Sequence, residues 1–245
     1  MTSNKEYITR FISRSYEKSF DYYMLADKDY VIPKKKVCDY IDRVLSIPYI
    51  EFIDYIRENK GIIDDTQLTQ SSNFITCSSD MCEAIESRGN PGLSFVEIGQ
   101  MFPKYNLKKN ETAYRKYGEN QVKTSTQLGL TFEYYDHWYL TCVGYVYNQL
   151  DHQKQEALLA RTILRIPLYQ NLLLCLIKED VYLTNYMNKI APSTQGRRAG
   201  SILKLLEFCL HQCRRENIKY HDLYYPVYVA KNKKIRITKF PGTAM

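Results

Sequence analysis

The order of predicted secondary-structure elements over residues 93–150 constrains the fold of this chain more than any other feature of its sequence. Apolar spacing predicts a short helix over residues 93–102 and a longer helix over residues 111–128, joined by a polar linker. Residues 130–140 have the composition of two strands, and residues 141–150 return to helical spacing. The predicted order is therefore helix, linker, helix, hairpin, helix.

Boundary signals agree with this order. Ser94 and Glu97 have the spacing of a capping box at the start of the first helix, and Gly129 is a C-cap candidate for the second. Residues 136–137 fall where the tip of the hairpin is expected, and Thr141 is an N-cap candidate for the last helix. This arrangement is typical of a winged helix-turn-helix, in which the second helix enters the major groove of DNA and the hairpin contacts the backbone.

The helix over residues 111–128 supplies the DNA-reading face of this first predicted module. Amide, guanidinium and ammonium groups match base edges or phosphates, and the Glu119 carboxylate would accept a hydrogen bond from cytosine. The alternative is an ordinary solvated helix face, with Gly118 as a loop or kink. The predicted DNA-binding residues are Arg115, Lys116, Tyr117, Glu119, Asn120, Gln121 and Lys123.

A second module follows the same logic. Apolar residues over 158–177 predict a buried helix with a kink or boundary at Pro167. Residues 181–190 predict a short helix, and residues 193–215 a longer one capped at its first or second residue. The start of this longer helix suits phosphates and base edges. The predicted DNA-binding residues of its helix are Ser193, Thr194, Gln195, Arg197, Arg198, Ser201 and Lys204.

The C-terminal quarter of the chain is basic. Residues 224–230 and 233–239 alternate apolar with cationic residues, which predicts a basic wing with Lys231, Lys233 and Lys234 as DNA-binding residues. Residues 181–245 hold 12 Lys and Arg against 3 Asp and Glu, a net charge of +9, whereas the other 180 residues carry −2. With 23 Tyr in the sequence, this favours an anionic partner such as nucleic acid. The alternative is a surplus that only confers solubility.

Residues 1–70 predict a helical N-terminal element, because apolar residues recur with helical spacing on both sides of Pro48. We therefore divide the chain into this element, a first winged-helix module over residues 71–150, and a second over residues 151–245 with the basic wing. The predicted fold class is mainly α with small β-hairpin wings, an α+β arrangement of two winged helix-turn-helix modules plus the N-terminal element.

Four stretches of the sequence resemble the tandem winged-helix DNA-recognition regions of type IIS restriction endonucleases and their nicking relatives. They are KYGENQVKTSTQLGL, WYLTCVGYVYNQL, RTILRIPLYQ and PSTQGRRAGSILKLLEF, and the resemblance covers about residues 90–215. This resemblance implies a two-module clamp on double-stranded DNA, with cleavage performed by a separate nuclease domain.

The sequence shows no nuclease motif of that family. A restriction fold needs an Asp on one strand and Glu-x-Lys on the next to hold Mg²⁺, whereas residues 58–60 follow Asp54 too closely and lie in helical sequence. Cys209 and Cys213 fit core thiols better than metal ligands. We therefore assign no catalytic and no metal-binding residue. Any endonuclease activity, with Mg²⁺ as its only cofactor, would come from a separate domain or subunit.

The leading functional hypothesis is sequence-specific binding of double-stranded DNA, as the target-recognition module or subunit of a type IIS-like restriction system with a nuclease partner. The alternatives are a plasmid replication initiator or transcriptional repressor with two winged helices, and a protein–protein interaction module. Seven scattered Cys and no apolar run near the ~20 residues of a membrane span predict a cytoplasmic protein. The resemblance to restriction endonucleases implies a prokaryotic protein, close to the nucleoid if it binds DNA. We expect no membrane partner, and the oligomeric state stays open.

Overall fold

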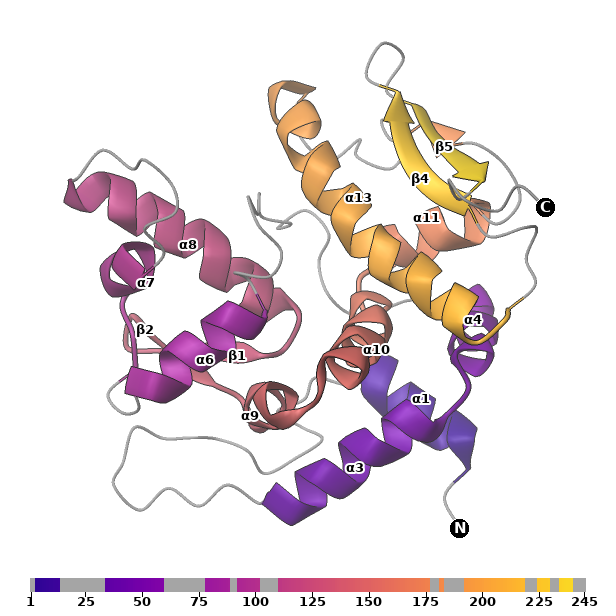
Figure 1. The fold of residues 1–245 in the computed structure, drawn as a ribbon, viewed down its shortest axis with the longest axis horizontal. Helices are drawn as coiled ribbons and strands as arrows, with labels where there is room; N and C mark the ends of the chain where they lie inside the picture. The colour runs from indigo at the N-terminus through magenta and orange to yellow at the C-terminus, as the bar shows by residue number, and fades with distance from the viewer. Residues whose placement is uncertain are drawn as a thin grey trace. The chain divides into compact units, whose positions relative to one another are not determined.

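The computed structural model describes residues 3–13, 34–59, 78–88, 92–101, 110–176, 181–182, 192–218, 224–229 and 234–239 (Figure 1). These residues are mainly helical, with a two-stranded and a three-stranded antiparallel sheet, which confirms the α+β class at this level. Within the described ranges, no helix is long and apolar enough to cross a membrane.

The chain forms two compact units. Unit 1 comprises residues 1–15, 44–68 and 156–245, and unit 2 comprises residues 16–43 and 69–155. The predicted first module, residues 71–150, therefore falls within unit 2, and the predicted second module falls in unit 1 from residue 156 onward. The residues of the predicted N-terminal element are shared between the two units, and its helix α3 (Lys34–Ser46) has residues in both.

Unit 2 contains the helix and hairpin order expected for the middle of the chain. Its elements are α6 (Ser79–Arg88), α7 (Phe95–Met101), α8 (Glu111–Gln127), β1 (Thr131–Tyr134), β2 (His137–Leu140) and α9 (Cys142–Gln149). The Ser94 amide donates to Glu97 Oε2 at 2.8 Å and the Glu97 amide to Ser94 Oγ at 3.3 Å, which confirms the capping box. Thr141 Oγ1 accepts from the Gly144 amide at 2.9 Å, as expected for the N-cap of α9. Gly129 has a φ of +75°, as expected for a glycine that ends α8.

Helices α7 and α8 cross with their backbones in direct contact. A Cβ added to Gly118 would lie 1.9 Å from the carbonyl oxygen of Phe95, and one added to Gly99 would lie 2.1 Å from that of Tyr114. Gly118 lies inside a continuous helix and is buried. It is therefore not a loop, and its missing side chain is what allows the two helices to approach.

Unit 1 builds its core from N-terminal and C-terminal helices together. Its elements are α1 (Asn4–Ser13), α4 (Tyr49–Glu58), α10 (His152–Ile163, whose first residues belong to unit 2), α11 (Pro167–Leu176), β3 (Val181–Tyr182), α13 (Pro192–Arg215), β4 (Tyr224–Val229) and β5 (Lys234–Lys239). Helix α4 contacts α1, α11 and α13. Phe52 of α4 packs edge-on against Phe11 of α1, with ring centroids 6.0 Å apart, and the Tyr49 hydroxyl donates to the Ala160 carbonyl at 3.2 Å.

The three-stranded sheet of unit 1 has the order β3–β5–β4. The hairpin strands β4 and β5 pair antiparallel, with Tyr228 opposite Ile235, and Val181 of β3 lies opposite the same Ile235 on the other side. The predicted helix over residues 181–190 is therefore wrong at its start, because Val181 and Tyr182 are strand formers that pair with β5. The rest of that prediction lies outside the described residues.

Candidate nucleic-acid interface

Helix α8 presents only part of the predicted reading face to solvent. Arg115, Lys116 and Lys123 are exposed, and Glu119 and Asn120 are half-buried. Tyr117 and Gln121 are buried instead, beside Gly118 and Val122 on the side of the helix that faces the core. A spacing of four residues places them on one face, and this face packs inward. We therefore remove Tyr117 and Gln121 from the set of residues that can reach a ligand.

The exposed face of α8 carries a Lys116–Glu119–Lys123 cluster. Lys116 Nζ lies 2.8 Å from Glu119 Oε2, and Lys123 Nζ lies 2.6 Å from Glu119 Oε1. Hydrogen bonds from Lys116 and then from Lys123 lower the pKa of Glu119, so the carboxylate is charged at neutral pH. The cluster spans two helical turns with a net charge of +1.

An aromatic stack links this cluster to the β1–β2 hairpin. Lys123 Nζ lies 5.9 Å from the centre of the Phe95 ring, and that ring stacks on Trp138 of β2 with centroids 3.9 Å apart. Leu93 forms an isolated antiparallel bridge with Trp138. Sequence reasoning missed this bridge, although Leu93 stands directly before the capping box, where an apolar residue commonly fixes the entry of the chain.

The β1–β2 hairpin turns at Tyr135 and Asp136, one residue earlier than predicted. Both have positive φ values, 47° and 58°, as a two-residue type I′ turn requires. His137 Nδ1 lies 2.9 Å from the Tyr135 carbonyl oxygen. Tyr135 is 80% exposed, and the neighbouring Glu133 and Asp136 are exposed too. Because residues 131–140 contain no Lys or Arg, this hairpin has no cation of its own for a phosphate.

Helix α13 contains the second predicted reading surface. It begins at Pro192, so Ser193 and Thr194 lie inside its first turn and are not its N-cap; Pro is favoured at the first helical position because its missing N–H needs no partner there. Arg198 and Ser201 are half-buried, and Lys204 is exposed. The side chains of Ser193, Thr194, Gln195, Arg197 and Lys234, and all of Lys231 and Lys233, lie outside the described residues.

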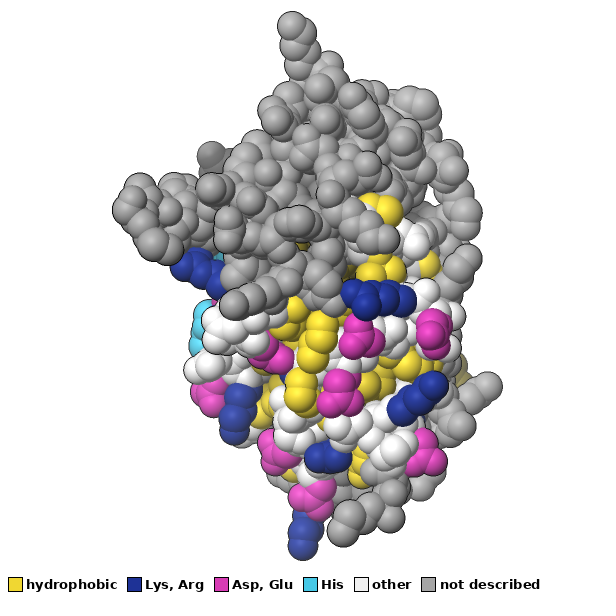
Figure 2. Space-filling model, turned by 90° about the vertical axis from the view of Figure 1, so that its right-hand side faces the viewer, with side chains coloured by type: hydrophobic (Ala, Val, Ile, Leu, Met, Phe, Trp, Pro, Cys, Tyr) yellow, Lys and Arg dark blue, Asp and Glu magenta, His cyan; other side chains and the backbone are white. Residues whose placement is uncertain are grey.

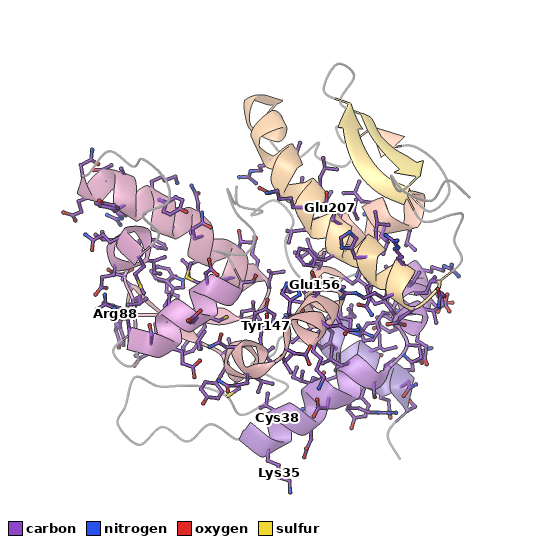
Figure 3. The ribbon with its side chains drawn as sticks, viewed as in Figure 1. Lys35, Cys38, Arg88, Tyr147, Glu156 and Glu207 are labelled. Carbon is purple, nitrogen blue, oxygen red and sulfur yellow. The ribbon has the colours of Figure 1, made fainter. Side chains whose placement is uncertain are left out.

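The inner face of α13 is the one predicted from its apolar spacing. Ile202, Leu205, Leu206 and Cys209 are buried. Figure 3 labels Glu207 midway along the helix, where burial raises its pKa and the nearby Lys204 opposes that shift. The exposed side of α13 thus offers the Lys204 cation next to a half-buried carboxyl group.

The cysteines of α13 are core thiols, as predicted. Cys209 and Cys213 are buried, and burial raises the pKa of Cys209 to about 12 and that of Cys213 further. Burial also lowers the pKa of His211. Among the described residues, no group of three or more His, Cys, Asp or Glu could hold a metal ion.

The sequence 58–60 that looks like part of a nuclease motif begins at a helix end. Asp54 lies on α4 and its carboxylate pairs with Arg57 at 2.9 Å, while Glu58 is the last residue of the helix. A restriction-type metal site needs its carboxylates on neighbouring strands, so Asp54 and Glu58 do not have the required backbone.

On the side of the molecule drawn in Figure 2, charge alone does not mark a binding face among the described residues. Lys and Arg side chains on this side lie interspersed with Asp and Glu. Exposed cations lie on α8 and α13, and among the described elements each of these helices directly precedes a hairpin.

No protein-family model matches the chain, and neither does any curated protein or solved structure with which it was compared.

Proposed function

We propose that this chain binds double-stranded DNA sequence-specifically through two winged-helix modules, as the target-recognition module or subunit of a type IIS-like restriction system. One observation carries the proposal: both units share an order of elements and a strand pairing. In unit 2, Leu93 precedes α7 and α8 and pairs with β2, the second strand of the hairpin. In unit 1, β3 precedes α13 and pairs with β5, again the second strand of the hairpin.

This arrangement supports a winged-helix interpretation because, in each unit, one helix directly precedes the hairpin. A winged helix-turn-helix inserts that helix into the major groove. In unit 2 the helix is α8, whose exposed Arg115, Lys116 and Lys123 are suited to phosphates and guanine edges. In unit 1 it is α13, which begins with a Pro-Ser-Thr-Gln-Gly-Arg-Arg sequence. A helix N-terminus favours phosphate oxygens because its amide groups are unpaired.

The hairpin of unit 2 favours a second candidate, a protein–protein interaction module. Its tip exposes Tyr135 between Glu133 and Asp136, and such an aromatic, acidic tip suits a protein surface better than a phosphate backbone. A module of this kind would show no affinity for DNA.

Selection of bound sequences from a random duplex library, at two salt concentrations and with Mg²⁺ present, tests the proposal. A short asymmetric motif without cleavage supports a recognition module, whereas tandem or inverted repeats support a replication initiator or repressor. Cleavage would reveal a nuclease site in this chain. No binding at low salt would exclude the DNA proposal and favour protein interaction.

Variants on the two helices make the test specific. Arg115→Ala, or Arg197→Ala with Arg198→Ala, should weaken binding to the selected motif by ~1–3 kcal/mol for each arginine that hydrogen-bonds a guanine. Lys154→Ala, an exposed change on α10, is the control. Lys234→Ala should weaken binding to every duplex and flatten the salt dependence by about one unit. Unchanged binding by the Arg variants would exclude these helices as the reading elements.

A further inference from the structure

We infer that Glu119 is a specificity-determining residue on the exposed face of α8, because its carboxylate opposes binding to DNA of arbitrary sequence. This inference rests on the proposed DNA binding. It assigns to one residue the difference between the affinity for a selected motif and the affinity for any other duplex.

The geometry of the cluster carries the inference. Each carboxylate oxygen of Glu119 accepts from a different lysine, Lys116 at 2.8 Å and Lys123 at 2.6 Å. The Glu119 side chain is 23% exposed, whereas the side chains of Lys116 and Lys123 are 68% and 47% exposed. The carboxylate thus lies recessed between two ammonium groups at the surface. Lys123 is further positioned by its contact with the face of the Phe95 ring.

This arrangement weakens binding that ignores sequence. A lysine that contacts a phosphate either keeps its ion pair with Glu119, which offsets its charge, or breaks that pair. If the pair breaks, the Glu119 carboxylate faces the anionic DNA backbone without a partner lysine. The cluster presents one net positive charge where two lysines alone would present two, so fewer counterions are released on binding. The carboxylate therefore lowers the affinity of α8 for every duplex, relative to two lysines alone, and this loss is an electrostatic penalty.

A matching base offsets the penalty. A carboxylate accepts a hydrogen bond from the N4 amino group of cytosine in the major groove, and both lysines can then turn to neighbouring phosphates or guanine oxygens. A duplex without an amino group at that position desolvates the carboxylate and offers it no hydrogen-bond donor in return. Discrimination by such a group comes from the loss of affinity that it imposes on wrong sequences.

A structural role alone would not produce this behaviour. Ion pairs three and four residues apart on a helix, in which the lysines are exposed to water, contribute little to stability, because water screens them and long side chains lose freedom on pairing. Replacement of Glu119 should therefore leave the fold intact, and its effect should be visible in DNA binding.

The test compares Glu119→Gln with Glu83→Gln in the full chain. Glu83 is an exposed carboxylate on α6 of the same unit, so the control makes the same change in net charge. We expect Glu119→Gln to bind a random-sequence duplex about tenfold more tightly, with a salt dependence steeper by about one unit. Library selection should also show that the preference for one C·G pair disappears. Glu119→Asp keeps the charge and should retain the weak non-specific binding of the unchanged protein.

The outcomes separate this inference from the proposed function. If the protein binds a selected motif, but Glu119→Gln has the same non-specific affinity and salt dependence as Glu83→Gln, the inference is wrong and the DNA proposal stands. If neither the unchanged protein nor Glu119→Gln binds any duplex at low salt, the DNA proposal fails and the inference fails with it. Fluorescence of Trp138, the only tryptophan in the sequence, reports whether unit 2 is folded in each variant.

Discussion

The backbone amide of Trp138 donates a hydrogen bond to the carbonyl of Leu93 at 2.9 Å, and the Leu93 amide donates to the Trp138 carbonyl at 3.2 Å. These two hydrogen bonds join β2, the second strand of the hairpin, to the segment before α7. The Trp138 ring, stacked on Phe95, adds a side-chain contact at the same place. Together they connect the β1–β2 hairpin to helices α7 and α8.

Trp138→Ala should lower the free energy of unfolding by about 3–5 kcal/mol, because it removes a large buried ring and leaves a cavity next to Phe95. Trp138→Phe should cost less, since a smaller ring can still stack. Urea unfolding followed by circular dichroism measures both. A decrease under about 1 kcal/mol for Trp138→Ala would show that the stack does not stabilise unit 2.

Two glycine substitutions should change stability in opposite directions. Gly118→Ala forces a methyl group against the Phe95 carbonyl and should cost about 3 kcal/mol, because backbone must move. Gly200→Ala, in α13, meets nothing within 4 Å and should stabilise by about 0.5–1 kcal/mol through helix propensity. Urea midpoints of the two variants test this. An unchanged stability of Gly118→Ala would contradict the close crossing of α7 and α8, and destabilisation by Gly200→Ala would contradict the open space around Gly200.

Arg161 is a buried cation that joins separate parts of unit 1. Its side chain is 1% exposed, and its Nη2 atom donates to the Ile47 carbonyl at 2.8 Å and pairs with Glu216 at 3.2 Å. The guanidinium also lies over the rings of Tyr49 and Phe52, at 5.4 and 5.3 Å. Burial lowers the pKa of Arg161, and the Glu216 carboxylate opposes that shift.

Arg161→Met should therefore destabilise unit 1 by about 3 kcal/mol, because it leaves the Glu216 carboxylate and the Ile47 carbonyl without this partner. Glu216→Gln tests the pair from the other side. A double-mutant cycle in urea should give a coupling of about 1–3 kcal/mol between the two side chains. Additive effects would mean that the ion pair contributes nothing beyond the packing of each residue.

The capping box of α7 predicts a pH dependence. Hydrogen bonds from Ser94 lower the pKa of Glu97, so the folded state favours the charged carboxylate. This contribution to stability is present above the ordinary Glu pKa of about 4.3 and is lost as the pH falls through the folded-state pKa. Ser94→Ala should cost about 1 kcal/mol at pH 7, and this cost should shrink at about pH 3. A constant cost at both values, from urea unfolding, would contradict the coupling to Glu97.

Local signals in the sequence determined the starts of α7 and α9 and the end of α8. The capping pair Ser94 and Glu97, the Thr141 cap and Gly129 act within four residues of the helix ends that they define. Their effect is therefore readable without knowledge of the fold. Pro48 likewise precedes α4, which begins at Tyr49, as predicted from the sequence. The apolar spacing of α13 also predicted which of its faces is buried.

Tertiary packing decided which residues of α8 are accessible and how each hairpin is completed. Tyr117 and Gln121 are polar enough for a surface, yet they are buried on the inner face of α8. Val181 begins a strand rather than a helix, because β5, far along the chain, offers it a partner. Local propensities left both outcomes open, since the free energies of alternative local conformations differ little. Contacts between distant segments, which sequence spacing does not reveal, selected one of them.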